Sequence, residues 1–263
     1  MHQEERPGAI ELMLVRHGES VGNVAASAAA RAGAEVIDVG LRDADVPLTD
    51  TGAAQATAFG RSLVELGEGS RPESVWCSPY LRARQTARTA LDTAGLDLPF
   101  RIDERIRDRE LGVLDLLTAT GVAARFPEED ARRRWLGKFY YRPPGGESWA
   151  DLALRLRSVT ADIDRLEAGR RVLVVAHDAI ILLFRYVCEG MTEEQLLELA
   201  STSTVRNASM TRLVRPSGRG LWSAQEFNRS EHLREQGVSV TDHGGDTAVV
   251  PHGEMEAAEV ARS

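Results

Sequence analysis

Short apolar runs alternate with longer segments of helical spacing along most of the chain. The runs at 12–15, 75–77 and 172–176 have the length and composition of buried strands, and residues 208–214 alternate like a later strand. This order is typical of a parallel sheet with helices on both faces. The pattern therefore predicts a three-layer α/β fold around a mostly parallel central sheet.

Helix starts are predicted where a capping residue precedes apolar residues spaced by three and four. We expect these N-caps: Thr49 or Asp50; Ser78, with Pro79 in the first helical position; Ser148, in a capping box with Asp151; and Thr192, in a capping box with Gln195. Residues 25–34 are rich in alanine, and we interpret them either as a short helix or as part of an insertion, 24–44, near the mouth of a site.

One catalytic domain is predicted over residues 1–241. Residues 106–146 interrupt the alternation of strands and helices, so we expect a small helical lobe over the carboxyl edge of the sheet. Its core is expected to come from the aromatic residues Trp135, Phe139, Tyr140 and Trp149. From Asp242 onward the chain has glycines, a proline and scattered charge, which favours a mobile tail over 242–263.

Composition restricts the class of protein. At 263 residues and 43% hydrophobic content the chain can bury a sizeable core, and its net charge of -8 argues against binding to nucleic acid or to an anionic membrane. It lacks both an apolar run of eighteen residues and the apolar segment of a secretory signal, which favours a cytoplasmic protein. Cys77 and Cys188 have apolar surroundings and no metal-ligand spacing, so we expect reduced thiols, no metal and no cofactor. An oligomer is compatible with this composition.

Candidate chemistry lies where two of the predicted strands end. The first apolar run leads into Arg16 and His17, and the run at 172–176 leads into His177 and Asp178. Ligands of parallel sheets bind beyond the carboxyl ends of the strands. A neutral imidazole is a nucleophile, and an arginine fork matches phosphate oxygens. These residues therefore indicate phosphoryl transfer to a histidine.

Three ordered motifs carry a resemblance to a known family. They are RHGES with Asn23, SPYLRARQTA at 78–87 and VVAHDA at 174–179, supported by PLTDTGAAQA from Pro47 and FNRSEHL from Phe227. Together they resemble the histidine phosphatase superfamily, also called phosphoglycerate mutase-like, over most of 12–233. The resemblance implies an α/β fold and a phosphohistidine intermediate.

The resemblance also assigns roles to residues. It makes His17 the nucleophile, completes the phosphate pocket with Arg16, Arg82 and His177, and places Ser20 and Asn23 among the substrate-binding residues. Arg82 is preferred over Arg84 because it fills the family's arginine position in the first turn after Ser78. The two arginines and the second imidazole would neutralise charge on the transferring group, which is much of what phosphoryl transfer requires.

The proton donor has three candidates. In the mutase-like branch a glutamate stands four residues before a glycine, and DRELG places Asp108 there. Glu110 lies two residues on and would point the same way in an extended segment. Asp178 matches the aspartate that is the donor in the acid phosphatase branch. We favour Asp108, then Glu110, then Asp178.

A further segment bears on the substrate. Residues 138–156 resemble a loop and helix of fructose-2,6-bisphosphatase, in which the matching tyrosine and arginine help to hold a second phosphate. The resemblance implies that Tyr141 and Arg142 bind a second anionic group of the substrate.

The favoured function is a phosphatase that hydrolyses a small phosphorylated metabolite through phosphohistidine on His17. Segments specific to phosphoglycerate mutases are not evident, which favours hydrolysis. The alternatives are a phosphoglycerate-type mutase and a non-catalytic protein that binds a phosphorylated ligand.

Overall fold

A six-stranded sheet forms the centre of the protein, as the computed structural model of residues 7–243 shows. Its strands follow the order β3-β2-β4-β1-β5-β6. They are β1 (Glu11–Arg16), β2 (Ser74–Cys77), β3 (Phe100–Ile102), β4 (Arg171–Ala176), β5 (Met210–Val214) and β6 (Ser223–Arg229). β3, β2, β4 and β1 are parallel, whereas β5 and β6 are antiparallel to their neighbours. The predicted mostly parallel α/β sheet is confirmed.

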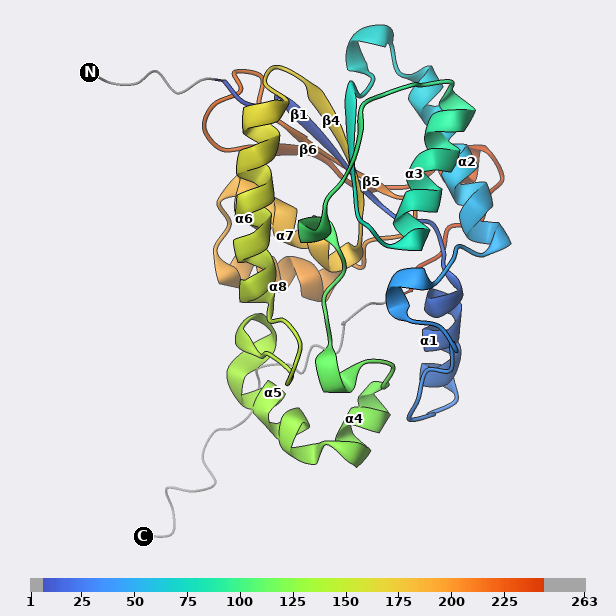
Figure 1. The fold of residues 1–263 in the computed structure, drawn as a ribbon, viewed down its shortest axis with the longest axis vertical. Helices are drawn as coiled ribbons and strands as arrows, with labels where there is room; N and C mark the ends of the chain where they lie inside the picture. The colour runs from blue at the N-terminus through green and yellow to red at the C-terminus, as the bar shows by residue number, and fades with distance from the viewer. Residues whose placement is uncertain (1–6, 244–263) are drawn as a thin grey trace, which may run out of the picture.

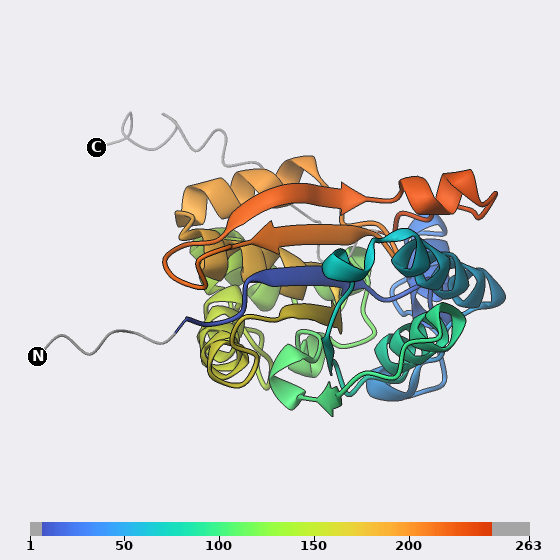
Figure 2. The ribbon, with the colours of Figure 1, turned by 90° about the horizontal axis from the view of Figure 1, so that it is seen from above.

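Helices cover both faces of this sheet, with α6, α7 and α8 on one face and α2 and α3 on the other (Figures 1 and 2). The helices are α1 (Val21–Arg31), α2 (Asp50–Glu65), α3 (Leu81–Ala94), α4 (Ala119–Arg125), α5 (Pro127–Tyr140), α6 (Trp149–Leu166), α7 (Asp178–Glu189), α8 (Glu193–Thr202) and α9 (Glu231–Glu235). None of the helices within residues 7–243 is both long and apolar enough to cross a membrane.

The alternation of side chains along β1 explains the two helical layers. Leu12 and Leu14 pack with the buried residues of α6 and α7, while Met13 and Val15 pack with those of α2 and α3. β4 divides its side chains between the same two cores. Because successive strand residues point to opposite faces, a continuous apolar run requires cover on both.

The predicted helix caps are confirmed at three of four places. Thr49 caps α2 through the N–H of Gly52, and the capping boxes at Ser148 and Thr192 form as expected. The prediction for Ser78 is wrong, because α3 begins at Leu81 and Tyr80 stands at its N-cap without a side-chain hydrogen bond. The Ser78 hydroxyl is engaged instead with a histidine of the site, described below.

Two edge strands, β3 and β6, were not predicted. β3 has only three residues, and none of them is fully buried. β6 is a mostly polar edge strand with a single buried position, Asn228. Neither strand is buried on both faces, so neither carries the apolar run that marks β1, β2 and β4.

Helices α4 and α5 lie beyond the end of the sheet toward which β1 runs, with α4 on the side of α1 and α5 below α6 (Figure 1). The expected aromatic core of this region is only partly formed. Phe139 and Trp149 are buried, but Trp135 is 82% exposed and Tyr140 is 57% exposed. α5 is interrupted at Gly137, whose φ of +73° is the left-handed conformation that glycine adopts readily. Because the backbone at Gly137 is not helical, the helical spacing of the aromatic residues does not predict which of them face the core.

The chain after α1 contacts this lobe. Val36 pairs with Leu117, and the Thr118 hydroxyl donates to the carbonyl of Ala34 at 2.6 Å. The alanine-rich segment is therefore a helix, α1, followed by a connection that packs against α4. It borders the mouth of the site through a short turn, Asp43–Asp45.

Candidate active site

The two predicted histidines stand side by side because β1 and β4 are adjacent and parallel. Their register pairs Arg16 with Ala176, and the N–H of His17 donates to the Ala176 carbonyl at 3.0 Å. The next residue on each strand is then a histidine, and the rings of His17 and His177 lie 5.2 Å apart, edge to face. Both side chains are almost fully buried. Strand pairing alone thus brings together two imidazoles that are 160 residues apart in the sequence.

His17 is held in the form that a nucleophile needs. Its Nδ1 lies 2.7 Å from the Gly18 carbonyl, an acceptor, so Nδ1 carries the hydrogen. Nε2 then keeps its lone pair and accepts from Nε of Arg82 at 3.2 Å. Burial first, then the charges of Arg82, His177 and Arg16, hold the pKa of His17 well below its ordinary value, against the opposing hydrogen bond to Gly18. His17 is therefore neutral at physiological pH.

Gly18 allows a close approach between two backbones. A Cβ at this position would lie 2.5 Å from the carbonyl oxygen of Gly52, at the start of α2. The N–H of Gly18 donates to the Thr86 hydroxyl of α3 at 2.9 Å. The glycine thus fixes the turn that follows His17 against two helices.

Arg16 is buried beneath the site and is held by backbone carbonyls. Its terminal nitrogens donate to the carbonyls of Val205 and His243, the latter at 3.0 Å. Its Nε is buried and has no hydrogen-bond partner among residues 7–243. The His243 ring lies between Glu19 and Ser27, 2.9 and 2.7 Å away. His243, the second residue of the predicted tail 242–263, therefore contacts Arg16 and Glu19, while residues 244–263 lie outside the described part of the chain.

Arg82 extends from the first turn of α3 over His17. Its Nε donates to His17, Nη1 donates to the carbonyl and Oδ1 of Asp43 at 2.6 and 2.9 Å, and Nη2 donates to Asp43 and Asp108 at 3.2 and 3.0 Å. The side chain is only 5% exposed. Arg84 is half-buried and makes no such contact with the site, which agrees with the preference for Arg82.

Asp108 is the candidate proton donor that touches the pocket. Its Oδ2 lies 3.0 Å from Arg82 and 3.2 Å from Nδ1 of His177. Burial favours the neutral acid, but His177, Arg82 and the N–H of Arg109 outweigh it and hold the pKa of Asp108 well below its usual range. In this arrangement Asp108 is ionised.

Arg155 of α6 fixes the segment that carries Asp108. Its guanidinium donates to the carbonyls of Arg105, Arg107 and Asp108, and it pairs with Glu147 at 3.0 Å. This partly buried arginine is 47 residues away from Asp108 in the sequence. No sequence motif drew attention to it.

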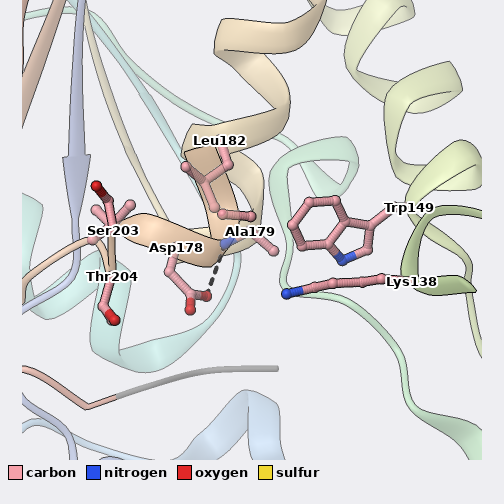
Figure 3. Close-up of a pocket in the computed structure, with 9 residues that line it drawn as sticks. Lys138, Trp149, Asp178, Ala179, Leu182, Ser203 and Thr204 are labelled. Carbon is pink, nitrogen blue, oxygen red and sulfur yellow. Dashed lines mark hydrogen bonds between the residues drawn. The ribbon is translucent and has the colours of Figure 1, made fainter. Parts of the chain in front are cut away.

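The other two donor candidates have different neighbours. Glu110 accepts from the Tyr80 hydroxyl at 3.1 Å and pairs with Arg107 at 3.4 Å, with a side chain that is 49% exposed. Asp178 accepts from the N–H of Ala179 at 2.8 Å and lines a small cavity of about 20 Å³ with Lys138 and Trp149 (Figure 3). This cavity has room for one or two water molecules.

Ser20 and Asn23 form the capping box of α1. The Ser20 hydroxyl accepts from the N–H of Asn23 at 3.2 Å, and Asn23 Oδ1 accepts from the N–H of Ser20 at 3.1 Å. Asn23 Oδ1 also accepts from Asn207 Nδ2, which in turn donates to the His17 carbonyl at 3.1 Å. These two acceptor contacts of Oδ1 orient the Asn23 amide.

Tyr141 and Arg142 are occupied by other partners. The buried Tyr141 hydroxyl donates to Glu129 at 2.9 Å, and Arg142 pairs with Asp151 through Nε at 2.7 Å. Arg142 is 61% exposed, so its ion pair lies at the protein surface. Neither has a described contact with His17, Arg82 or His177.

Besides Arg155, two residues of the site were not predicted from the sequence to lie there. Asp43 binds Arg82, and Ser78 Oγ lies 2.8 Å from Nε2 of His177. Ser78 belongs to the motif SPYLRARQTA, but the sequence predicted for it only the role of a helix N-cap. Asp43 lies in a turn whose sequence carries no periodic signal, so only the folded chain identifies its partner.

The arrangement as a whole defines a class of protein. A neutral histidine with an available lone pair stands among arginines and a second histidine, with a carboxylate at the rim. Such a pocket attracts a phosphoryl group and can accept it covalently. No group of three or more His, Cys, Asp or Glu side chains within residues 7–243 is arranged to hold a metal ion.

The chain belongs to the histidine phosphatase superfamily, branch 1, whose family model matches residues 12–230. It is 34% identical over 191 residues to a 2,3-bisphosphoglycerate-dependent phosphoglycerate mutase of Methylobacterium radiotolerans, covering 72% of this chain and 83% of that protein. A mutase of the same name, numbered 2, from Gloeobacter violaceus is 34% identical over 196 residues, covering 70% and 78%.

Solved structures with the same fold include phosphatases. A mycobacterial glucosyl-3-phosphoglycerate phosphatase superposes with a TM-score of 0.64 at 26% identity, over 84% of this chain and 99% of that one. An alpha-ribazole phosphatase of Shigella flexneri has a TM-score of 0.66 at 20% identity, over 84% and 96%, which shows the shared fold alone.

Proposed function

We propose that the protein hydrolyses a small phosphomonoester through a phosphohistidine on His17. The observation that carries the proposal is the state of this side chain. Nδ1 is fixed as the donor to Gly18, the pKa is lowered, and Nε2 lies against the guanidinium of Arg82. A buried structural histidine needs no such arrangement of its lone pair.

The first half of the reaction transfers the phosphoryl group. Nε2 of His17 forms the new N–P bond while the bond from phosphorus to the leaving oxygen breaks. Arg16, Arg82 and His177 stabilise the charge on the phosphoryl oxygens. Asp108 is ionised in the free protein, so it would first take up a proton from solvent as the phosphate dianion binds beside it and raises its pKa, as would any loss of its contact with Arg82. It would then give this proton to the leaving alcohol.

The second half returns the enzyme to its first state. Water attacks phosphorus, its proton passes to the carboxylate of Asp108, and the N–P bond breaks to restore neutral His17. The arginines supply the positive charge that a metal ion supplies in other phosphatases. We therefore expect activity to persist in EDTA.

The substrate is proposed to be a small phosphorylated metabolite. The similarity to a glucosyl-3-phosphoglycerate phosphatase supports hydrolysis, and the similarity to phosphoglycerate mutases supports the mutase as the second candidate. If the substrate carries a second anionic group, Arg142 is the exposed cation that we propose to meet it, after its pair with Asp151 opens.

Product analysis distinguishes these functions. The purified full chain is incubated with an aryl phosphate, phosphorylated glycerates and glycosylated phosphates, and inorganic phosphate is measured. A parallel reaction contains 3-phosphoglycerate primed with 2,3-bisphosphoglycerate and is analysed for isomers. Phosphate release with an acid-labile phosphoenzyme is expected. Isomer formation without release would establish the mutase, and phosphate binding without either reaction would establish a binding protein.

A further inference from the structure

Every N–H group of Arg82 already has an acceptor within the protein. A guanidinium has five N–H groups. One is directed at His17, three are directed at Asp43, and one is directed at Asp108. A phosphoryl group that reaches Nε2 of His17 needs N–H groups from this same guanidinium. The N–H group at Nε is released when Nε2 of His17 bonds to phosphorus, but a phosphate that is also held by Nη1 or Nη2 must displace one of the two carboxylates from them.

The two carboxylates differ in how firmly they are held. Asp108 also accepts from the N–H of Arg109, lies beside His177, and belongs to a segment fixed by Arg155. Asp43 lies in a three-residue turn, and its side chain is 40% exposed. Among residues 7–243 its carboxylate pairs with Arg82 alone. Asp43 is the partner that can move at lower cost.

The contact made by Asp43 resembles that of a phosphate. Its two carboxylate oxygens bind Nη1 and Nη2 of Arg82 at 2.9 and 3.2 Å, in the two-point geometry that guanidinium groups form with carboxylate and phosphate alike. Its backbone carbonyl binds Nη1 separately at 2.6 Å. The carbonyl can keep Arg82 in place after the carboxylate has left.

We propose that the Asp43 carboxylate competes with phosphate for Arg82, so that substrate binding and product release exchange one anion for the other. The proposal rests on the phosphate pocket proposed above. It makes Asp43 a positioning residue that weakens ground-state binding of phosphate. When inorganic phosphate leaves, the carboxylate returns to the guanidinium and neutralises a buried charge that would otherwise hold the product.

Binding of inorganic phosphate to the full chain tests the proposal by calorimetry, without turnover. Asp43→Asn and Asp43→Ala are expected to lower the dissociation constant of inorganic phosphate by about threefold to tenfold, the effect expected from removing a partly exposed ion pair. Asp45→Asn is the matched control. Asp45 lies in the same turn but pairs with the exposed Arg42, so its variant is expected to bind phosphate like the wild type.

The outcomes separate the proposal from the function on which it rests. A wild-type protein that neither binds phosphate nor releases it from any substrate would overturn the proposed pocket. A wild type that binds phosphate, with Asp43 variants that bind it equally or more weakly, would overturn the role of Asp43 alone. If Asp43 had only a structural role, its loss would weaken phosphate binding or lower the melting temperature. Tighter binding in the Asp43 variants therefore distinguishes competition from a structural role.

Discussion

The floor of the pocket and its mouth are built in different ways. On the floor, Arg16, His17 and His177 are all buried, and their positions follow from adjacent parallel strands. At the mouth, the partly exposed Asp43 lies on a short turn and pairs with Arg82. The exposed Arg142, which we propose to lie near the mouth, pairs with Asp151. The comparison shows that strand pairing positions the two histidines and the buried Arg16, while a turn supplies the carboxylate that pairs with Arg82.

The difference has a physical basis in what holds each part. Residues of the floor are surrounded by close-packed side chains and by the hydrogen bonds of the sheet, so a displacement would disturb the core. Ion pairs at the mouth are screened by solvent and contribute little to stability. Variants of the floor are thus expected to affect the chemistry itself, and variants of the mouth to affect binding and selectivity.

The largest effect is expected from His17→Ala, because no other side chain at the floor is placed to form the N–P bond. Turnover of every substrate should fall on the order of 10⁴-fold or more, and the acid-labile phosphoenzyme should disappear. Quenched reactions with labelled substrate measure the second effect directly. Substantial residual activity with phosphoenzyme would place the nucleophile elsewhere.

A buried histidine that does not contact the side chains of His17, Arg82 or His177 provides the matched control. His232 is also buried, packs edge to face with Phe59, and has its pKa lowered to about 4, mainly by burial. His232→Gln removes a neutral buried imidazole without touching the pocket. We expect the His232→Gln variant to have a lower melting temperature but still to form the phosphoenzyme. The loss of phosphoenzyme in His17→Ala could then not be attributed to the mere loss of a buried imidazole.

The sequence predicts the floor of the pocket better than its mouth. The apolar runs of β1 and β4 and the motifs after them locate His17 and His177, because burial and periodicity leave a local signal. The prediction that Ser78 is a helix N-cap was wrong: its hydroxyl contacts His177, and a serine before a helix does not by itself distinguish the two roles. Asp43 and Arg155 left no signal, because their contacts join segments that are 39 and 47 residues apart.

The proton donor is expected to show the next largest effect, and one that depends on the leaving group. Asp108→Asn should slow hydrolysis of an alkyl phosphate by about 10²- to 10⁴-fold, because an alkoxide leaves poorly without a proton. An aryl phosphate with an acidic phenol needs no protonation and should lose far less. The two rates are compared for each variant.

Glu110→Gln and Asp178→Asn are the controls for this comparison. Neither side chain contacts His177 or Arg82, and we expect losses that are small and equal for the two substrates. A loss confined to the alkyl phosphate in Glu110→Gln, with Asp108→Asn unaffected, would transfer the role of donor to Glu110. The same pattern in Asp178→Asn would identify that residue instead.

Two arginines of α3, Arg82 and Arg84, test whether direct contact with His17 determines the loss of kcat. Arg82→Ala should lower kcat by about 10²- to 10³-fold, the usual cost of removing one stabilising donor from a transition state. Arg84→Ala removes the same charge from the same turn of α3 but does not touch His17, and we expect less than a tenfold loss. Equal losses would show that α3 contributes its overall charge and that the contact with His17 matters little.

The smallest effect is expected at the mouth, from Arg142→Ala. If Arg142 binds a second anion equally in the ground and transition states, the variant should raise KM for a bisphosphate severalfold and leave kcat nearly unchanged. The effect is limited because the exposed guanidinium must first leave Asp151. An aryl phosphate has no second anion and should be hydrolysed as before.

If kcat for the bisphosphate falls as well, remote binding energy is being used to align the phosphate with His17. Equal losses on both substrates would instead give Arg142 a structural role, through the Asp151 carboxylate that also caps α6.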